Sequence, residues 1–214
     1  KTGCFGDVST FSFFYGHHMS TIEGGMVCTD DDDLANLIRS IRSHGWDRDL
    51  TESVSGELKK KYSIDEFNSS YTFYYPGFNI RSTEIQAFLG ISQLRNIDHI
   101  IQKRCDNFAL YEKLLGHISF LSLESHSLVS NFCYPIIHEK SQKICNSLFK
   151  EEIAHRPLIA GSISKQPFWT DRYGYQSLKN GDKGHEYGFY VPNNHQILSS
   201  EIEFICDTIN REVT

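Results

Sequence analysis

The sequence contains no apolar run long enough to cross a membrane and no segment with the pattern of a signal peptide. Basic residues are not in excess either, because 21 lysines and arginines stand against 27 aspartates and glutamates, for a net charge of −6. Such a chain has no basic footprint for nucleic acid or for an anionic membrane surface. These absences predict a cytoplasmic protein that binds neither nucleic acid nor a membrane.

Closely spaced cysteines are missing as well, although the chain has six of them. We therefore expect reduced thiols, and neither a zinc knuckle nor a disulfide-stapled scaffold. The length of 214 residues, with 39% apolar and 13% aromatic residues, allows a substantial core in one or two domains. The cysteines are Cys4, Cys28, Cys105, Cys133, Cys145 and Cys206.

What the sequence does contain is a polar stretch near its start, residues 12–25, which reads SFFYGHHMSTIEGG. Apolar segments flank this stretch, and they predict two short strands that present the polar residues between them. A metal site formed by His17, His18 and Glu23 is one alternative. Because adjacent histidines of an extended segment point to opposite faces, they cannot easily share an ion, and we expect no metal.

The following segments predict a helix and then a loop. Residues 30–33 supply four acidic residues for the start of a helix that closes at Gly45. The motif His44-Gly45-Trp46-Asp47-Arg48 comes next. Residues 51–70 are polar and rich in lysine, without an apolar period, so a loop is expected there.

A second candidate site lies in residues 71–81, which read YTFYYPGFNIR. Gly77 permits a backbone turn, and the neutral amide of Asn79 can donate hydrogen bonds to a dianion. The aromatic residues by themselves also fit a buried strand. Both interpretations stay open at this point.

From Ser82 onward the pattern predicts one long helix that ends at Gly116 and carries the chain into a smaller domain. The elements expected in that domain are a strand at residues 131–137, a helix at residues 141–152, and a return strand with its turn at residues 155–161. The segment at residues 188–192 follows, and then a final helix from Ser200 with Ile202, Ile205 and Ile209 inward.

Three motifs together resemble a known family: the stretch from Ser12 to Gly25, the segment Gly77-Phe78-Asn79-Ile80-Arg81, and the segment Arg156-Pro157-Leu158-Ile159-Ala160-Gly161. The chain is similar to the DegT/DnrJ/EryC1/StrS aminotransferases of nucleotide-sugar biosynthesis. This resemblance implies an α/β fold that is the C-terminal part of a type I PLP-dependent aminotransferase. Residues 1–100 would end the large cofactor domain, and residues 101–214 would form the small α+β C-terminal domain.

In that family a lysine binds the cofactor covalently, and His17 stands in its place. A histidine there resembles the branch of sugar 3-dehydratases, and so implies pyridoxamine or pyridoxal 5′-phosphate held without a covalent bond. Imidazole can accept a proton near neutral pH, whereas an ordinary lysine is protonated there. The resemblance therefore makes His17 the catalytic base.

The resemblance also assigns the other site residues. Ser12 and Asn79 would bind the cofactor phosphate, with Asn79 reaching the site of a neighbouring subunit, so a homodimer is expected. His44, Arg81 and Arg156 would contact the substrate, a nucleotide-linked 4-keto-6-deoxy sugar. An amino donor such as glutamate is the further partner.

The implied activity is removal of the C3 hydroxyl from that sugar, in deoxysugar biosynthesis. One alternative is a sugar aminotransferase that uses another lysine, of which Lys59, Lys60 and Lys61 are the first after Lys1. Another is a non-catalytic remnant. The resemblance covers only the C-terminal half, or a little more, of a family member, so this polypeptide by itself is expected to be inactive.

Overall fold

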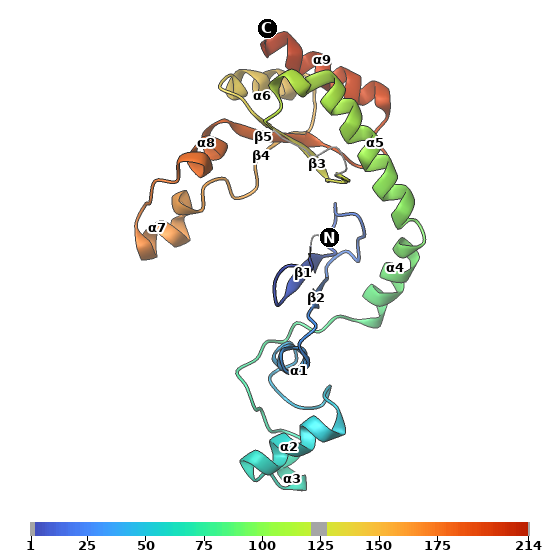
Figure 1. The fold of residues 1–214 in the computed structure, drawn as a ribbon, viewed down its shortest axis with the longest axis vertical. Coiled ribbons are helices and arrows are strands. Elements are labelled where there is room, and N and C mark those ends of the chain that lie inside the picture. Colours follow the sequence, from blue (N-terminus) through green and yellow to red (C-terminus); the bar gives the residue numbers. More distant parts are fainter. Residues whose placement is uncertain (1–2, 121–127, 214) are drawn as a thin grey trace. The chain divides into compact units, whose positions relative to one another are not determined.

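The computed structural model describes residues 3–120 and 128–213. The chain forms two compact units, Lys1–Arg95 (unit 1) and Asn96–Thr214 (unit 2), and its elements are labelled in Figure 1. None of the helices in the described ranges is both long and apolar enough to span a membrane.

Unit 1 begins with an antiparallel hairpin, as the sequence predicted. Strand β1 (Ser9–Ser12) pairs with strand β2 (Gly25–Cys28), so the ends of the two strands that face the connecting loop lie side by side. Helix α1 (Asp32–Ile41) follows, and its N-cap is Asp31, whose carboxylate accepts the Leu34 N–H at 2.9 Å. The acidic run therefore begins a helix, as expected.

The loop expected at residues 51–70 is wrong, because this segment forms helix α2 (Glu52–Tyr62) and the short helix α3 (Glu66–Ser69). The expectation relied on apolar periodicity, which is weak here. Capping provides the missing signal: Thr51 accepts the Val54 N–H, and Asp65 accepts the Asn68 N–H at 2.8 Å. Lysines in the last turn of α2 also suit the helix dipole.

The single long helix is also wrong. The structure has helix α4 (Glu84–Leu94) and helix α5 (Ile97–Leu115), with the helical geometry interrupted at Asn96. The N-cap of α4 is Thr83 rather than Ser82, and Thr83 forms a capping box with Gln86. The interruption coincides with the division between the two units.

Unit 2 contains a three-stranded antiparallel sheet in which the last strand of the sequence is central. The order is β3 (Cys133–Ile137), β5 (Gly188–Pro192), β4 (Arg156–Pro157). Helices α5, α6 (Ser141–Lys150) and α9 (Ser199–Val213) lie on one side of this sheet in Figure 1. The remaining elements are the short turns η1 (Gly116–Ile118) and η2 (Ile163–Lys165) and helices α7 (Pro167–Tyr173) and α8 (Lys179–Tyr187).

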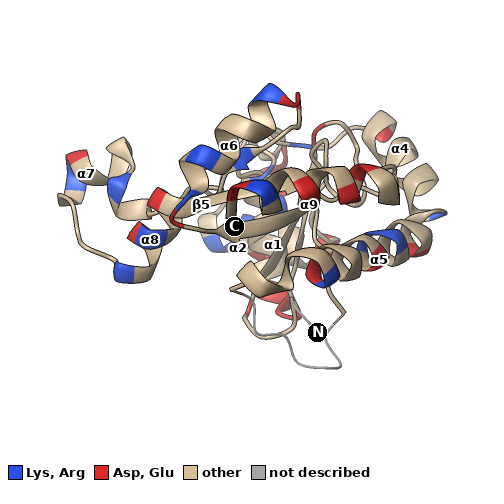
Figure 2. Cartoon of the chain, turned by 90° about the horizontal axis from the view of Figure 1, so that it is seen from above, with Lys and Arg blue, Asp and Glu red and all other residues tan. Residues whose placement is uncertain are grey.

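The apolar core lies in unit 2, between the sheet and the helices. Ile202, Ile205 and Ile209 of α9 are buried, which confirms their predicted inward orientation. Figure 2 shows charges of both signs interspersed along α5 and α9. The core also contains Phe108, Tyr111, Leu115, Tyr134, Ile136, Ile144, Leu148, Phe189, Val191, Ile197 and Cys206.

Unit 1 differs sharply in burial. Among its described residues Leu58 is the only apolar side chain in the buried class. Helix α4 exposes four large apolar side chains, and the strands of the hairpin expose others. Unit 1 therefore has folded elements and local hydrogen bonds, but little core of its own. The exposed residues of α4 are Ile85, Phe88, Ile91 and Leu94.

Candidate functional site

The loop that carries His17 continues the β1–β2 hairpin beyond its strands. The Phe13 N–H donates to the Gly24 carbonyl at 2.9 Å, and the Tyr15 N–H donates to the Ile22 carbonyl at 3.2 Å. His17 follows at the tip, where its N–H donates to the Phe14 carbonyl at 3.2 Å and its side chain is half-buried. The hydrogen bonds of the hairpin thus hold His17 at the tip of the loop.

The glycines after His17 are required by close packing. Gly24 has φ +147°, and a Cβ there would lie 2.5 Å from Thr21 Oγ1. A Cβ on Gly25 would lie 2.9 Å from the Phe11 carbonyl oxygen. Thr21 is buried, and its hydroxyl donates to the Glu23 carbonyl at 2.8 Å. The Glu-Gly-Gly turn therefore closes on Thr21, a residue that the sequence analysis did not single out.

Helix α4 holds this turn from the outside. The side-chain amide of Gln86 donates to the Glu23 carbonyl at 2.7 Å, across 63 positions of sequence. Gly90 faces Thr21 so closely that a Cβ there would lie 3.3 Å from the threonine methyl group. Sequence reasoning missed Gln86, although its place three residues after Thr83 is the signature of a capping box.

Ser12 is the last residue of β1, on the same hairpin as His17. Its Oγ accepts the Phe14 N–H at 3.2 Å, which leaves the hydroxyl proton available to an outside acceptor. Ser12 is exposed. One hairpin therefore presents a hydroxyl donor and an imidazole at its loop end.

A second group of predicted residues is brought together by backbone pairing between two distant segments. Ser43 and Asn79 form an antiparallel bridge. The His44 N–H donates to the Phe78 carbonyl at 2.7 Å, and the Ile80 N–H donates to the Arg42 carbonyl at 3.0 Å. His44, Asn79 and Arg81 consequently belong to one local structure. The interpretation of residues 71–81 as a buried strand is not supported, because Asn79 and Arg81 are exposed.

Two glycines allow these segments to approach. Gly45 has φ +85°, and a Cβ there would lie 1.8 Å from the Tyr75 carbonyl oxygen. A Cβ on Gly77 would lie 2.4 Å from the Gly45 nitrogen and 2.4 Å from the His44 carbonyl carbon. The backbones touch where both residues lack a side chain.

Behind this pairing lies a small polar interior. Asp47 is buried, and its carboxylate accepts a hydrogen bond from the Ser55 hydroxyl. Burial raises the pKa of the Tyr74 phenol, and the nearby Asp47 carboxylate raises this pKa further. Tyr74 therefore stays neutral at physiological pH.

Arg156 lies in unit 2, as the first residue of β4, and is exposed opposite Tyr190 of β5. Its neighbour His155 is half-buried, and His155 Nδ1 forms a hydrogen bond with the Ile153 carbonyl at 2.8 Å. The substrate role of Arg156 stays a prediction.

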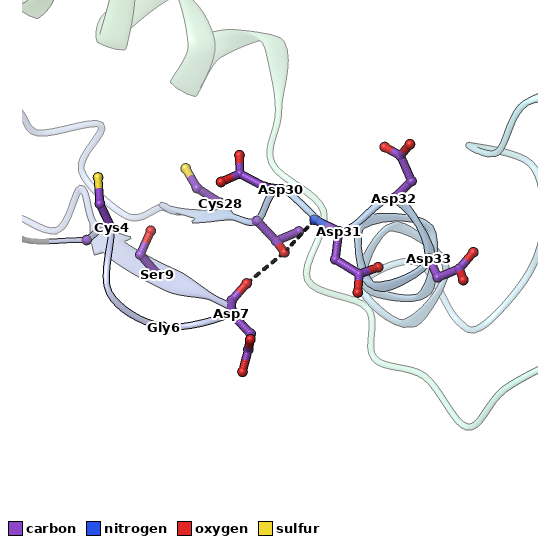
Figure 3. Close-up of a pocket in the computed structure, with 11 residues that line it drawn as sticks. Cys4, Gly6, Asp7, Ser9, Cys28, Asp30, Asp31, Asp32 and Asp33 are labelled. Atoms are coloured by element: carbon purple, nitrogen blue, oxygen red, sulfur yellow. Dashed lines mark hydrogen bonds between the residues drawn. The ribbon is translucent and has the colours of Figure 1, made fainter.

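A different pocket lies at the opposite end of the hairpin from His17 (Figure 3). There the Thr29 hydroxyl donates to the Asp7 carbonyl at 2.7 Å and accepts the Asp31 N–H at 3.2 Å. Five aspartates line this pocket, so it repels phosphate. Within the described ranges, no group of three His, Cys, Asp or Glu side chains is placed to hold a metal ion. The aspartates are Asp7, Asp30, Asp31, Asp32 and Asp33.

Comparison with known proteins adds the family context for this geometry. Residues 1–210 match the DegT/DnrJ/EryC1/StrS aminotransferase family. The chain belongs to this family. The resemblance inferred from the histidine loop and the Gly-Phe-Asn-Ile-Arg segment is thereby confirmed. The proteins similar to this chain include a sugar aminotransferase as well as sugar dehydratases.

Two curated relatives are GDP-4-keto-6-deoxy-D-mannose 3-dehydratases. The enzyme of Yersinia pseudotuberculosis is 29% identical over 99% of this chain and 56% of its own length. The enzyme of Escherichia coli O55:H7 (strain CB9615 / EPEC) is 31% identical over 97% of this chain and 55% of its own length. The chain thus spans about half the length of these family members.

A solved structure confirms the expected fold class. The E. coli GDP-4-keto-6-deoxy-D-mannose-3-dehydratase with bound hydrated PLP superposes with a TM-score of 0.82 at 27% identity. The match covers 98% of this chain and 56% of that one. The chain has the α/β fold of the PLP-dependent family. The assignment of unit 1 to the cofactor domain and unit 2 to the small domain stays a prediction.

Proposed function

We propose that the complete protein is a pyridoxamine- or pyridoxal-phosphate-dependent dehydratase. Its substrate would be a nucleotide-linked 4-keto-6-deoxyhexose, from which it removes the C3 hydroxyl. The observation that carries this proposal is His17 at the tip of the hairpin loop, between Ser12 and the Glu-Gly-Gly turn. In this family's pattern that place belongs to the lysine that would otherwise bind the cofactor.

The residues present suit such a cofactor. Ser12 and Asn79 offer a hydroxyl and an amide, which are neutral donors for a phosphate dianion, and both side chains are exposed. No lysine lies in the hairpin loop; Lys59, Lys60 and Lys61 lie in the last turn of α2, and Lys1 lies outside the described residues. When bound, the cofactor supplies an amine for the C4 ketone and a ring that withdraws electrons.

The role of His17 follows from its chemistry and position. A half-buried imidazole on a hydrogen-bonded loop can accept a proton through a ring nitrogen without forming a covalent link to the cofactor. The C3 hydroxyl would then take up a proton and leave the sugar as water, and hydrolytic release of ammonia would leave a 3-deoxy-4-keto product. The amine form of the cofactor would supply the two electrons of this reduction. An amino donor such as glutamate would regenerate the amine. Covalent anchoring and proton transfer, which one lysine combines in the transaminases, are thus separated here.

Product analysis tests the proposal directly. The full-length protein, with pyridoxamine phosphate and glutamate, is incubated with GDP-4-keto-6-deoxymannose, and the sugar product is analysed by mass spectrometry and NMR. Loss of the C3 oxygen is the expected result. An amino sugar that retains this oxygen would establish the aminotransferase alternative, and no conversion of any nucleotide-linked 4-keto sugar would favour the non-catalytic one.

Ser12 should affect cofactor binding more than proton transfer. Replacing Ser12 with Ala in the full-length protein removes one donor to the phosphate, so we expect cofactor affinity to fall by about tenfold. The turnover rate at saturating cofactor should change by less. Fluorescence titration with pyridoxamine phosphate measures the affinity. Ser9→Ala, on the same strand at the end away from the loop, is the matched control; equal losses in both variants would contradict the assignment.

Asn79 should complete the site of a partner subunit in a homodimer. Phe73 and Phe78 beside it are 55% and 63% exposed, which leaves an apolar surface for a second chain. His17→Asn and Asn79→Ala homodimers should each be nearly inactive. Co-expression should restore activity, because half of the sites in a mixed dimer then combine an intact His17 with an intact Asn79.

The complementation has a clear opposite outcome. If Asn79 serves its own subunit, every site in the mixed dimer lacks one of the two residues, and no activity returns. Size-exclusion chromatography with light scattering gives the oligomeric state independently, and a monomeric, active full-length protein would also contradict the prediction.

A further inference from the structure

The backbone carbonyl of Glu23, in the turn that follows His17, accepts hydrogen bonds from two side chains. The Thr21 hydroxyl donates to this oxygen at 2.8 Å from within the loop, and the side-chain amide of Gln86 donates to it at 2.7 Å from helix α4. A carbonyl oxygen has two lone pairs, so these two donors use its full accepting capacity. The bond from Gln86 thus ties the His17 loop to a different element of unit 1.

The loop is strained just before this turn. Ile22 has φ +73°, a value that L residues adopt rarely and that is least favourable for a β-branched side chain. The Ile22 carbonyl accepts the Tyr15 N–H at 3.2 Å, so the strained residue also takes part in the pairing across the loop, beside His17. Such a backbone conformation persists only where surrounding contacts enforce it.

Contacts with α4 enforce the conformation on both sides of Ile22. Thr21, which precedes it, is buried, and its methyl group lies so close to the helix that a Cβ on Gly90 would be 3.3 Å away. Glu23, which follows it, is held through its carbonyl by Gln86. Positions 86 and 90 are one turn apart and share a face of the helix. One face of α4 therefore grips both neighbours of the strained residue.

The amide of Gln86 performs two tasks that can be separated. Its Oε1 accepts the Thr83 N–H at 2.8 Å and completes the capping box, while its Nε2 donates to the Glu23 carbonyl. The capping box needs only an acceptor at this position, and glutamate supplies one as well as glutamine does. The bond to the loop needs an N–H donor, which glutamate lacks.

We propose that Gln86 is a positioning residue for the reaction at His17. It holds the His17 loop in its strained conformation from α4, and so keeps the imidazole in one place. This assignment rests on the proposed function, in which His17 accepts a proton, and extends it to a residue that acts through another. Proton transfer needs the two heavy atoms within hydrogen-bond reach, and a displacement of about 1 Å can lower a rate by about a hundredfold.

Replacing Gln86 with glutamate in the full-length protein tests the assignment, because it removes the donor and retains the cap. Amide hydrogen exchange at residues 13–24, measured by mass spectrometry without cofactor, should become faster. The value of kcat should fall by about tenfold or more, whereas KM and cofactor affinity should change by less than about twofold. The thermal unfolding temperature should stay the same, because the capping box survives.

Gln93→Glu makes the same exchange on an exposed residue two turns further along α4, and should alter neither hydrogen exchange nor kcat. The assignment requires both effects in Gln86→Glu, so an unchanged kcat or an unchanged hydrogen exchange would overturn it. An equal effect of Gln93→Glu would overturn it too. So would parallel losses of kcat, cofactor affinity and unfolding temperature, because Gln86 would then act only on the stability of the fold.

The proposed function can fail separately from this assignment. Hydrogen exchange reports on the loop without any reaction, and the sugar product identifies the chemistry. If Gln86→Glu loosens the loop and slows amino transfer to the sugar instead of C3 dehydration, the dehydratase is refuted and the positioning role of Gln86 is retained.

Discussion

Replacing His17 with asparagine in the full-length protein should lower the rate of C3 dehydration by roughly a hundredfold or more. Asparagine is similar in size and polarity, so the loop should keep its backbone hydrogen bonds, such as those from Phe13 to Gly24 and from Tyr15 to Ile22. It cannot take up a proton, however. Cofactor binding should therefore survive while turnover is lost, and single-turnover kinetics with a separate cofactor titration would show the difference.

Replacing His17 with lysine should change the attachment of the cofactor from non-covalent to covalent. A lysine amine at this point can form the covalent bond that the family ordinarily uses, so we expect visible absorbance and a cofactor that borohydride fixes to the protein. Dehydration should fall at the same time. Mass spectrometry of the reduced protein would place the cofactor on residue 17.

The adjacent histidine provides the matched control for both variants. His18→Asn changes the same kind of side chain one position away, and we expect it to retain most of the activity. If His17→Asn dehydrates the sugar at the normal rate, the base is another residue. A large loss in His18→Asn together with a small loss in His17→Asn would move the role to His18.

Replacing Gly77 with alanine should destabilise unit 1 more than any conservative surface change. The new methyl group would meet the Gly45 nitrogen and the His44 carbonyl carbon at 2.4 Å, and backbone atoms cannot move aside as a flexible side chain can. The two segments must separate. We expect a loss of about 3 kcal/mol or more in the free energy of unfolding of the full-length protein, measured by denaturant titration.

Gly56 offers a control of identical chemistry. It lies within α2, and a Cβ there would meet no atom within 4 Å. Gly56→Ala should therefore be neutral or stabilise the protein by up to about 1 kcal/mol, because alanine is the better helix former. Equal stability of the two variants would show that the close approach at Gly77 is not rigid.

The sequence predicted those parts of the fold and site that depend on local signals. The two strands around His17 followed from short apolar segments on either side of a polar stretch, and the structure pairs these strands as a hairpin. Helix α1 followed from its acidic start. The inward face of α9 followed from isoleucines at helical spacing. In each case the residues that determine the element lie close together in the sequence.

Other features depend on contacts between distant residues or on weak signals. Helix α2 has little apolar period, and only its caps reveal it. The break at Asn96 is marked by neither glycine nor proline, so two helices looked like one. The approach of residues 43–45 to residues 77–80 depends on the pairing of Ser43 with Asn79, and the hydrogen bond from Gln86 to the Glu-Gly-Gly turn spans 63 positions. No periodicity in the sequence encodes such pairs.

The central place of β5 in the sheet has a consequence for how unit 2 is made. During synthesis β3 and β4 leave the ribosome first, but each pairs only with β5 within the described sheet, so their edges stay unsatisfied until residue 192 has emerged. Helix α9, which seals the core, emerges later still. Unit 2 must therefore fold late and over long sequence separations, when nearly all of its residues are free of the ribosome. A nascent chain stalled before β5 would present bare strand edges and apolar faces to chaperones.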